Sequence, residues 1–233
     1  TWMDARARGA PVTSRAGCPV ELSALWSRGC ETLSRLARAA GDTALADRAQ
    51  AECARTRAAF RARFWCAETG YPYDVISERP DGPGAFHDAS LRPNAVMALA
   101  VDPACFSPEQ AIELLDRAQV LVTRAGLRSL APDHPSYAGR PEIGSLLMDN
   151  NVHQGAVWPF LLGFFVRAAR RCAAEAHLGP FLQRLVASTA ANEAALGQLP
   201  ELAGGDAPHA PAGCIAQASS VAELLRAVAW DLA

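Results

Sequence analysis

Apolar residues recur at helical spacing along most of this chain, and that periodicity limits its fold more than any other feature. Across Val20–Ala40, leucine, tryptophan and alanine return every three, four or seven residues, which is typical of one face of an amphipathic helix. Gly41 then predicts a helix end, because glycine is common just after the last helical turn. Asp42 can cap a second helix, which we expect to run to about Phe64.

The same pattern predicts five more helices, and no segment shows the strict alternation that marks a half-buried strand. The fifth predicted helix is nearly apolar on all sides, so we expect it to be deeply buried. The sequence therefore predicts an all-α protein with about seven helices. The five further segments are Pro93–Val101, Pro108–Gly126, His153–Ala176, Pro180–Leu196 and Gly213–Leu232.

Three connections between these helices are long and rich in glycine, proline and aspartate. They span residues 65–92, 127–152 and 196–212, and they hold many of the polar and aromatic side chains. Long loops in a compact helical domain are usually functional or disordered. Short links on one side and long links on the other predict stacked helical hairpins that present a site on one face.

Charge and composition exclude several classes of function. The 22 basic and 24 acidic residues give a net charge of −2 without a basic stripe, so we expect no nucleic-acid partner. The longest apolar stretch, residues 157–166, is interrupted by Pro159 and Gly163 and falls short of the ~20 residues of a membrane span. Seven cysteines without a C-x-x-C pair favour reduced thiols in a cytoplasmic compartment. We expect no metal and no cofactor, since the histidines lack metal spacing and no glycine-rich phosphate loop is present.

A few residues carry possible chemistry, although each also has a purely structural interpretation. Asp4 lies two residues after Trp2, and an indole beside a carboxyl group favours the protonated form that a general acid needs. His153 and Gln154 can bond sugar hydroxyls while Trp158 stacks on a sugar ring. The alternatives are a capped turn at Asp4 and a helix cap with a core tryptophan at 153–158.

Two loop segments are similarly ambiguous when they are considered alone. Arg92 forms part of an Asp-x-x-x-Arg-Pro-Asn stretch that is more often a helix cap than a site. Glu201 lies in a loop where a carboxylate can activate water, but solvated loop acids are the commoner case.

Taken in order, however, six short blocks resemble the C-terminal part of glycogen debranching enzymes, which carries the amylo-α-1,6-glucosidase activity. Matching blocks extend from residue 1 to about residue 227, so they cover nearly the whole chain. The blocks are Thr1–Ala5 (TWMDA), 17–26 (GCPVELSALW), 89–94 (ASLRPN), 126–132 (GLRSLAP), 153–159 (HQGAVWP) and 205–218 (GDAPH and GCIAQA).

This resemblance implies an (α/α)6 toroid and hydrolysis of an α-glucan with inversion, by an acid and a base on either side of the scissile bond. By matching position, Asp4 is the acid and Glu201 the base. A complete toroid has more helices than the seven predicted, so we expect residues 1–233 to be a partial catalytic domain, truncated at its N-terminus. The implied glucose-binding residues are Trp2, Glu21, Trp26, Arg92, His153, Gln154 and Trp158.

The chain also departs from the family pattern, most clearly in the loop that carries Glu201. Ala203 replaces an aromatic residue and Gly204 replaces an acid, which predicts a looser loop and slower turnover. Restoring both, as Ala203→Phe with Gly204→Asp, is then expected to raise kcat. Two other functions stay open: a different toroid glycosidase of glucoamylase, trehalase or α-glucosidase type, and a non-catalytic α-glucan-binding remnant.

Overall fold

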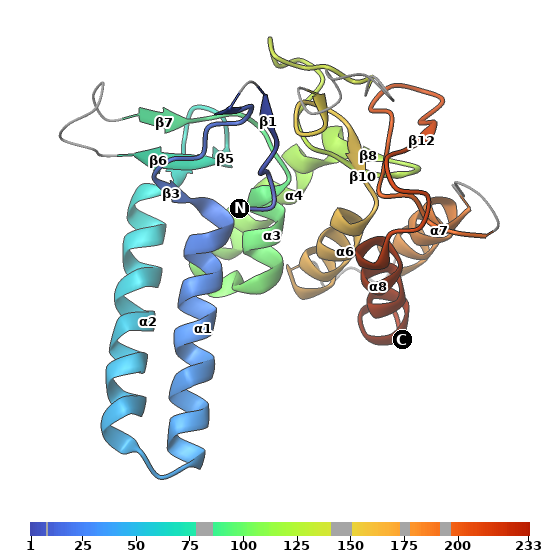
Figure 1. Ribbon diagram of the computed structural model, residues 1–233. Coiled ribbons are helices and arrows are strands. Elements are labelled where there is room, and N and C mark those ends of the chain that lie inside the picture. The colour runs from blue at the N-terminus through green and yellow to red at the C-terminus, as the bar shows by residue number, and fades with distance from the viewer. Residues whose placement is uncertain (8, 78–85, 141–150, 173–177, 192–196) are drawn as a thin grey trace.

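The computed structural model describes residues 1–7, 9–77, 86–140, 151–172, 178–191 and 197–233 (Figure 1). Within these ranges the chain forms seven α-helices. They are α1 (Val20–Ala39), α2 (Thr43–Arg63), α3 (Asn94–Val101), α4 (Pro108–Ala118), α6 (Phe160–Cys172), α7 (Leu178–Ala190) and α8 (Ala218–Arg226), which continues as a π-helical turn over Ala227–Asp231. None of the helices in the described ranges combines the length and the apolar character that a membrane crossing requires.

The helices pack in two rows. In one row α3 contacts α1 on one side and α6 on the other, and α6 contacts α8. In the second row α2 packs on α1, α4 packs on α3 and α6, and α7 packs on α6. The main core cluster includes Val96 and Leu99 of α3 together with Leu161 and Leu162 of α6, none of which is exposed to solvent. Figure 1 shows the short strands gathered at the end where α1, α3 and α6 begin.

Each strand is two or three residues long, and all pairs are antiparallel. The largest sheet has the order β12-β11-β10-β9-β8, and in it Val157 pairs with Ala203 and Trp158 with Leu127. The strands are β1 (Arg6–Ala7), β2 (Ala10–Pro11), β3 (Cys18–Pro19), β4 (Trp65–Cys66), β5 (Tyr71–Pro72), β6 (Val75–Ser77), β7 (Phe86–Asp88), β8 (Val122–Thr123), β9 (Gly126–Arg128), β10 (Val157–Trp158), β11 (Leu202–Ala203) and β12 (Pro211–Ala212).

The all-α prediction is therefore correct for the body of the molecule and incomplete for its loops. The helix predicted over 108–126 ends at Ala118, because the chain turns into a 3-10 turn and the β8–β9 hairpin. The helix predicted from His153 begins only at Phe160, and His153 to Trp158 form turns and β10 instead. Residues 173–176 and 192–196, which end two predicted helices, lie outside the described residues.

One face of α1 is exposed although it is apolar. The hairpin of α1 and α2 extends away from the other helices in Figure 1. The last helical segment also exposes large apolar side chains. The exposed set comprises Leu22, Leu25, Trp26, Leu33 and Leu36 on α1, with Leu225, Val228 and Trp230 near the C-terminus.

Candidate active site

A cluster of four rings brings the N-terminal segment against the segment that precedes α6. The indole of Trp2 meets the rings of His153, Trp158 and Phe160 edge-on, with centroid distances of 5.3, 5.3 and 5.4 Å. His153 and Trp158 stack on each other at 5.5 Å with an interplanar angle of 22°. Such ring pairs stabilise beyond the burial of their area, so this cluster fixes where the N-terminal segment docks.

Hydrogen bonds set the orientation of both tryptophans. The N–H of Trp2 donates to the side-chain oxygen of Asn94 at 2.8 Å, and the N–H of Trp158 donates to the carbonyl of Val152 at 2.8 Å. Both indoles are half-buried. Because their only polar hydrogens are already used, they can offer a ligand the ring rather than a donor, which suits the apolar face of a sugar.

Arg92 joins three segments beneath these rings. Its guanidinium donates to the carbonyls of His153 (2.7 Å) and Ser129 (3.1 Å) and to the side-chain oxygen of Gln154 (3.0 Å). Gln154 in turn donates to the hydroxyl of Thr13 at 3.1 Å. Arg92 is 4% exposed, so its guanidinium binds the loops and not solvent. Gln154 is half-buried and lies between Arg92 and the protein surface.

A buried ion-pair network supports the same end of the molecule. Arg15 binds Glu21 through two nitrogens and binds the carboxylate of Asp74 from its Nε at 2.9 Å. Asp74 also accepts from Asn94 at 2.7 Å. Burial raises the pKa of Asp74 to about 6, and the charges of Arg15 and Arg92 limit the rise. Glu21 is 2% exposed and both its oxygens face Arg15, so it lies beneath the site as a support.

Ala5 and Leu202, the residues that follow the two proposed catalytic acids, lie together at one small apolar cluster. Val152, Leu202 and Ala212 form this cluster, and Ala5 and Trp158 pack against it. Asp4 precedes Ala5 and is exposed, while the ring of Trp2 faces His153, Trp158 and Phe160. Glu201 precedes Leu202, is partly exposed, and accepts from the backbone N–H of Cys214 at 3.0 Å. Segments almost two hundred residues apart in sequence thus meet here.

Trp26 lies apart from this group. Its N–H donates to Glu52 of α2 at 3.1 Å, and it lines a groove between α1 and α2 with 59% of its surface exposed. Trp26 follows Glu21 by five residues, so it points about 140° away around the helix at 100° per residue. The expectation that Trp26 lines the same cleft as Trp158 is therefore not met.

The loop that carries Glu201 is tightly packed where the sequence predicted it to be loose. Ala203 is fully buried against Ala125 and Val157, so the position has no room for an aromatic ring. The N–H of Gly205 donates to Gly139 at 2.5 Å, and a side chain at Gly205 would collide with Gly155 and lie 2.6 Å from the Tyr137 hydroxyl. Close backbone contact, rather than loop freedom, explains the glycine at 205.

The sequence analysis included Asn94 in a helix-cap stretch but did not identify its buried partners Arg15 and Asp74. Arg15 lies in a polar stretch and Asp74 between an aromatic and an apolar segment, and neither position has a spacing that signals a site. The burial of Arg15, which only the structure reveals, is what identifies this support. In the described part of the chain, no group of three His, Cys, Asp or Glu side chains is placed to hold a metal ion.

The family model described as amylo-alpha-1,6-glucosidase matches residues 1–226. The glycogen debranching enzyme of Saccharomyces cerevisiae is 37% identical over 90 residues, a match that covers 36% of this chain and 6% of the yeast protein. The chain thus spans only a small part of that curated relative.

Solved structures agree on the fold. The GH63 mannosylglycerate hydrolase of Thermus thermophilus has a TM-score of 0.65 at 15% identity, covering 89% of this chain and 45% of that one. A bacterial glucoamylase complexed with acarbose has a TM-score of 0.66 at 15% identity, covering 93% of this chain and 34% of that one. These likenesses show that the helices form part of a helical toroid.

Proposed function

The chain belongs to the amylo-alpha-1,6-glucosidase family, and on that premise we propose that it forms the catalytic part of a glycoside hydrolase that releases α-1,6-linked glucose from glycogen or a limit dextrin. Within this proposal, residues 1–233 are part of a larger toroid domain. The substrate is an α-glucan, and neither a metal nor a cofactor takes part.

The observation that carries the proposal is the ring cluster of Trp2, His153 and Trp158 above Arg92 and Gln154. Stacked and edge-on aromatic rings with a few fixed polar groups are what a neutral sugar needs, since its ring face is apolar and its edge carries hydroxyls. Trp158 and Ala5 also pack against the apolar cluster that contains Leu202. The sequence neighbours of Asp4 and Glu201 therefore lie next to Trp158, which supports assigning both acids to this site.

In the proposed mechanism, Asp4 protonates the glycosidic oxygen and Glu201 removes a proton from the attacking water. Inverting enzymes separate these carboxyl groups by about 6.5–9.5 Å to admit the water. The Cys214 N–H donates to one oxygen of Glu201 and restrains the position of that oxygen. Among the described residues nothing donates to its other oxygen, which is therefore available to the water.

We also propose a cytoplasmic location. Four of the cysteines are buried free thiols: Cys30, Cys53, Cys66 and Cys105. Reduced thiols packed as small apolar side chains suit a reducing compartment.

The test is glucose release by the full-length protein from a glycogen limit dextrin, with the anomer followed by NMR as it forms. Inversion predicts β-glucose as the first product. Asp4→Asn and Glu201→Gln are each expected to lower kcat by about 10²–10⁴-fold. Initial α-glucose, or full kcat in either variant, contradicts the assigned roles. Preferred cleavage of maltose or trehalose points to another toroid glycosidase, and glucan binding without glucose release points to a binding remnant.

A further inference from the structure

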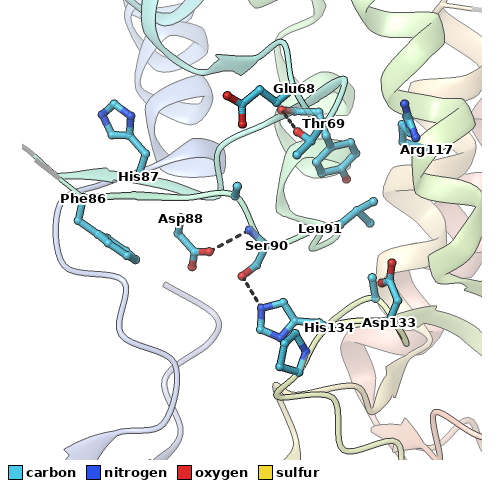
Figure 2. Close-up of a pocket in the computed structure, with 14 residues that line it drawn as sticks. Glu68, Thr69, Phe86, His87, Asp88, Ser90, Leu91, Arg117, Asp133 and His134 are labelled. Atoms are coloured by element: carbon cyan, nitrogen blue, oxygen red, sulfur yellow. Dashed lines mark hydrogen bonds between the residues drawn. The ribbon is translucent and has the colours of Figure 1, made fainter.

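A cleft of about 660 Å³ is lined by residues outside the candidate active site. It is bounded by the turn between β4 and β5, by β7 and the residues after it, by the end of α4, and by residues 131–135 (Figure 2). Ser90 lines this cleft and lies two residues before Arg92. Two residues of extended chain span at most about 7 Å, so the cleft adjoins the aromatic cluster's supporting arginine.

An aromatic side chain stands at the rim of the cleft. Along β7, Phe86 and Asp88 point to one side and His87 to the other, as Figure 2 shows and as strand alternation requires. Phe86 is 55% exposed. The exposed ring beside a carboxylate gives the cleft an apolar surface next to a polar group, the combination that binds a sugar ring.

Beside this ring lie a hydrogen-bond acceptor, the carboxylate of Asp88, and a hydrogen-bond donor, the hydroxyl of Ser90. Asp88 accepts the N–H of Ser90 through Oδ1 at 2.9 Å, and no described group donates to Oδ2. The hydroxyl of Ser90 lies 3.2 Å from Nε2 of His134, whose Nδ1 accepts the N–H of Ser136 at 3.0 Å.

This second bond determines which way the serine hydroxyl points. With Nδ1 acting as an acceptor, a neutral His134 carries its proton on Nε2. Nε2 then donates to the Ser90 oxygen, so the Ser90 proton is left to point into the cleft. The cleft thus presents Asp88 Oδ2 as an acceptor and Ser90 as a donor, two residues apart, next to the ring of Phe86.

We propose that this cleft is an outer carbohydrate subsite, in which a glucosyl unit of an α-glucan stacks on Phe86. Neighbouring sugar hydroxyls are held in opposite senses: one donates to Asp88 Oδ2 and the next accepts from Ser90. His134 is a positioning residue that fixes the Ser90 proton.

Charge favours a neutral ligand over an anionic one. Among the described residues that line the cleft, three carry carboxylates, Glu68, Asp88 and Asp133, and one is an arginine, Arg117. A phosphate or other anion would meet net repulsion here, whereas sugar hydroxyls bond readily to carboxylates. The choice of an α-glucan as the ligand rests on the proposed function. The same glucan chain would then occupy both places, with its branch glucose at Trp2 and Trp158 and a more distant unit on Phe86.

Binding of maltohexaose to the full-length protein, measured by calorimetry, tests the subsite. Phe86→Ala and Ser90→Ala are each expected to raise Kd about three- to tenfold, the equivalent of one lost stack or one lost hydrogen bond. Phe181→Ala is the matched control, because Phe181 on α7 is a phenylalanine with 45% exposure outside the cleft. It should leave Kd within about twofold.

The dependence of affinity on glucan length separates a binding role of Phe86 from a purely structural one, because a structural defect would not act on long glucans alone. Wild-type affinity should rise from maltose to maltohexaose, and Phe86→Ala should remove most of that rise. An unchanged Kd in both cleft variants, or equal losses in the Phe181→Ala control, overturns the subsite. Phe86-dependent binding of maltohexaose, with no glucose released from the limit dextrin, would support the subsite and reject the proposed hydrolase. Glucose release from the limit dextrin, with Phe86-independent binding of maltohexaose, would do the reverse.

Discussion

The N–H of Trp2 donates to the side-chain oxygen of Asn94 at 2.8 Å, across 92 residues of sequence. The amide of Asn94 in turn donates to Asp74, which Arg15 binds. The indole beside Asp4 is therefore oriented by a chain of buried polar groups that begins at an ion pair. Substitutions at Asn94, Asp74 or Arg15 should therefore shift the position of the N-terminal segment.

Asn94→Ala should lower stability. The substitution leaves the Trp2 N–H and one acceptor of Asp74 without their partner, and an unsatisfied buried polar group costs about 1–3 kcal/mol. For a chain of this size each 1 kcal/mol shifts Tm by about 2–4 °C. Thermal unfolding of the full-length protein, followed by circular dichroism, measures the change. Equal Tm values for wild type and Asn94→Ala would show that these bonds contribute nothing.

Ala203→Phe should destabilise the protein instead of improving turnover. Ala203 has no exposed surface and touches Ala125 and Val157. Inserting a ring into a filled position typically costs about 1–3 kcal/mol through strain. Urea unfolding compares this variant with wild type. A gain in kcat with unchanged stability would mean that the loop rearranges to receive the ring.

Gly205→Ala and Gly204→Ala form a matched pair in one loop. An added methyl group at 205 collides with the Gly155 carbonyl, whereas at 204 the nearest atom, the Asp206 carbonyl oxygen, lies 3.5 Å away. Gly205→Ala should therefore lower Tm and also kcat, because Glu201 is carried on the same loop, while Gly204→Ala stays close to wild type. Thermal unfolding and glucose release test both; similar behaviour of the two variants would contradict the packing described here.

Acid should weaken the contact between α2 and the end of α3. Asp102 accepts two hydrogen bonds from Arg57, at 2.7 and 2.8 Å, and one from Ser27. Burial raises the pKa of Asp102, but the bonds from Arg57 and Ser27 outweigh it, so the pKa lies below its ordinary value of 3.8. A folded pKa below the unfolded one adds stability above about pH 4, and that stability is lost as the pH falls through the folded pKa.

Urea unfolding between pH 2 and 5 measures this dependence. The wild-type free energy of unfolding should fall more steeply below pH 4 than that of Asp102→Asn, which has no carboxyl group to titrate at this position. Parallel curves for the two proteins would show that Asp102 contributes nothing to acid sensitivity.

The helices could be predicted from the sequence because their signal is local. The end of α2 was correct to within a residue or two, since its boundary depends on nearby residues. The ladders around β10 and β11 were not predicted, because two-residue strands are too short to show alternation and are held by pairing with distant segments.

The site divides in the same way. His153, Gln154 and Trp158 were identified from one short block, and the structure places them together with Arg92. Trp26 was assigned to the same cleft, but periodicity does not reveal which partner an apolar face will meet, and this tryptophan turns toward α2. The catalytic roles of Asp4 and Glu201 stay predictions.

The bond between Gln154 and Thr13 closes a loop of 141 residues. Contacts this distant in sequence form late in folding, because the entropy of loop closure must be overcome before they stabilise anything. On the ribosome, α1 to α4 can form and Asn94 can bind Trp2 while the segment that carries Asp4 still lacks its aromatic partners, since His153 and Trp158 have not yet emerged. A chain interrupted before that point would have helices and Trp2 but not the complete ring cluster, so assembly of the candidate site follows completion of most of the chain.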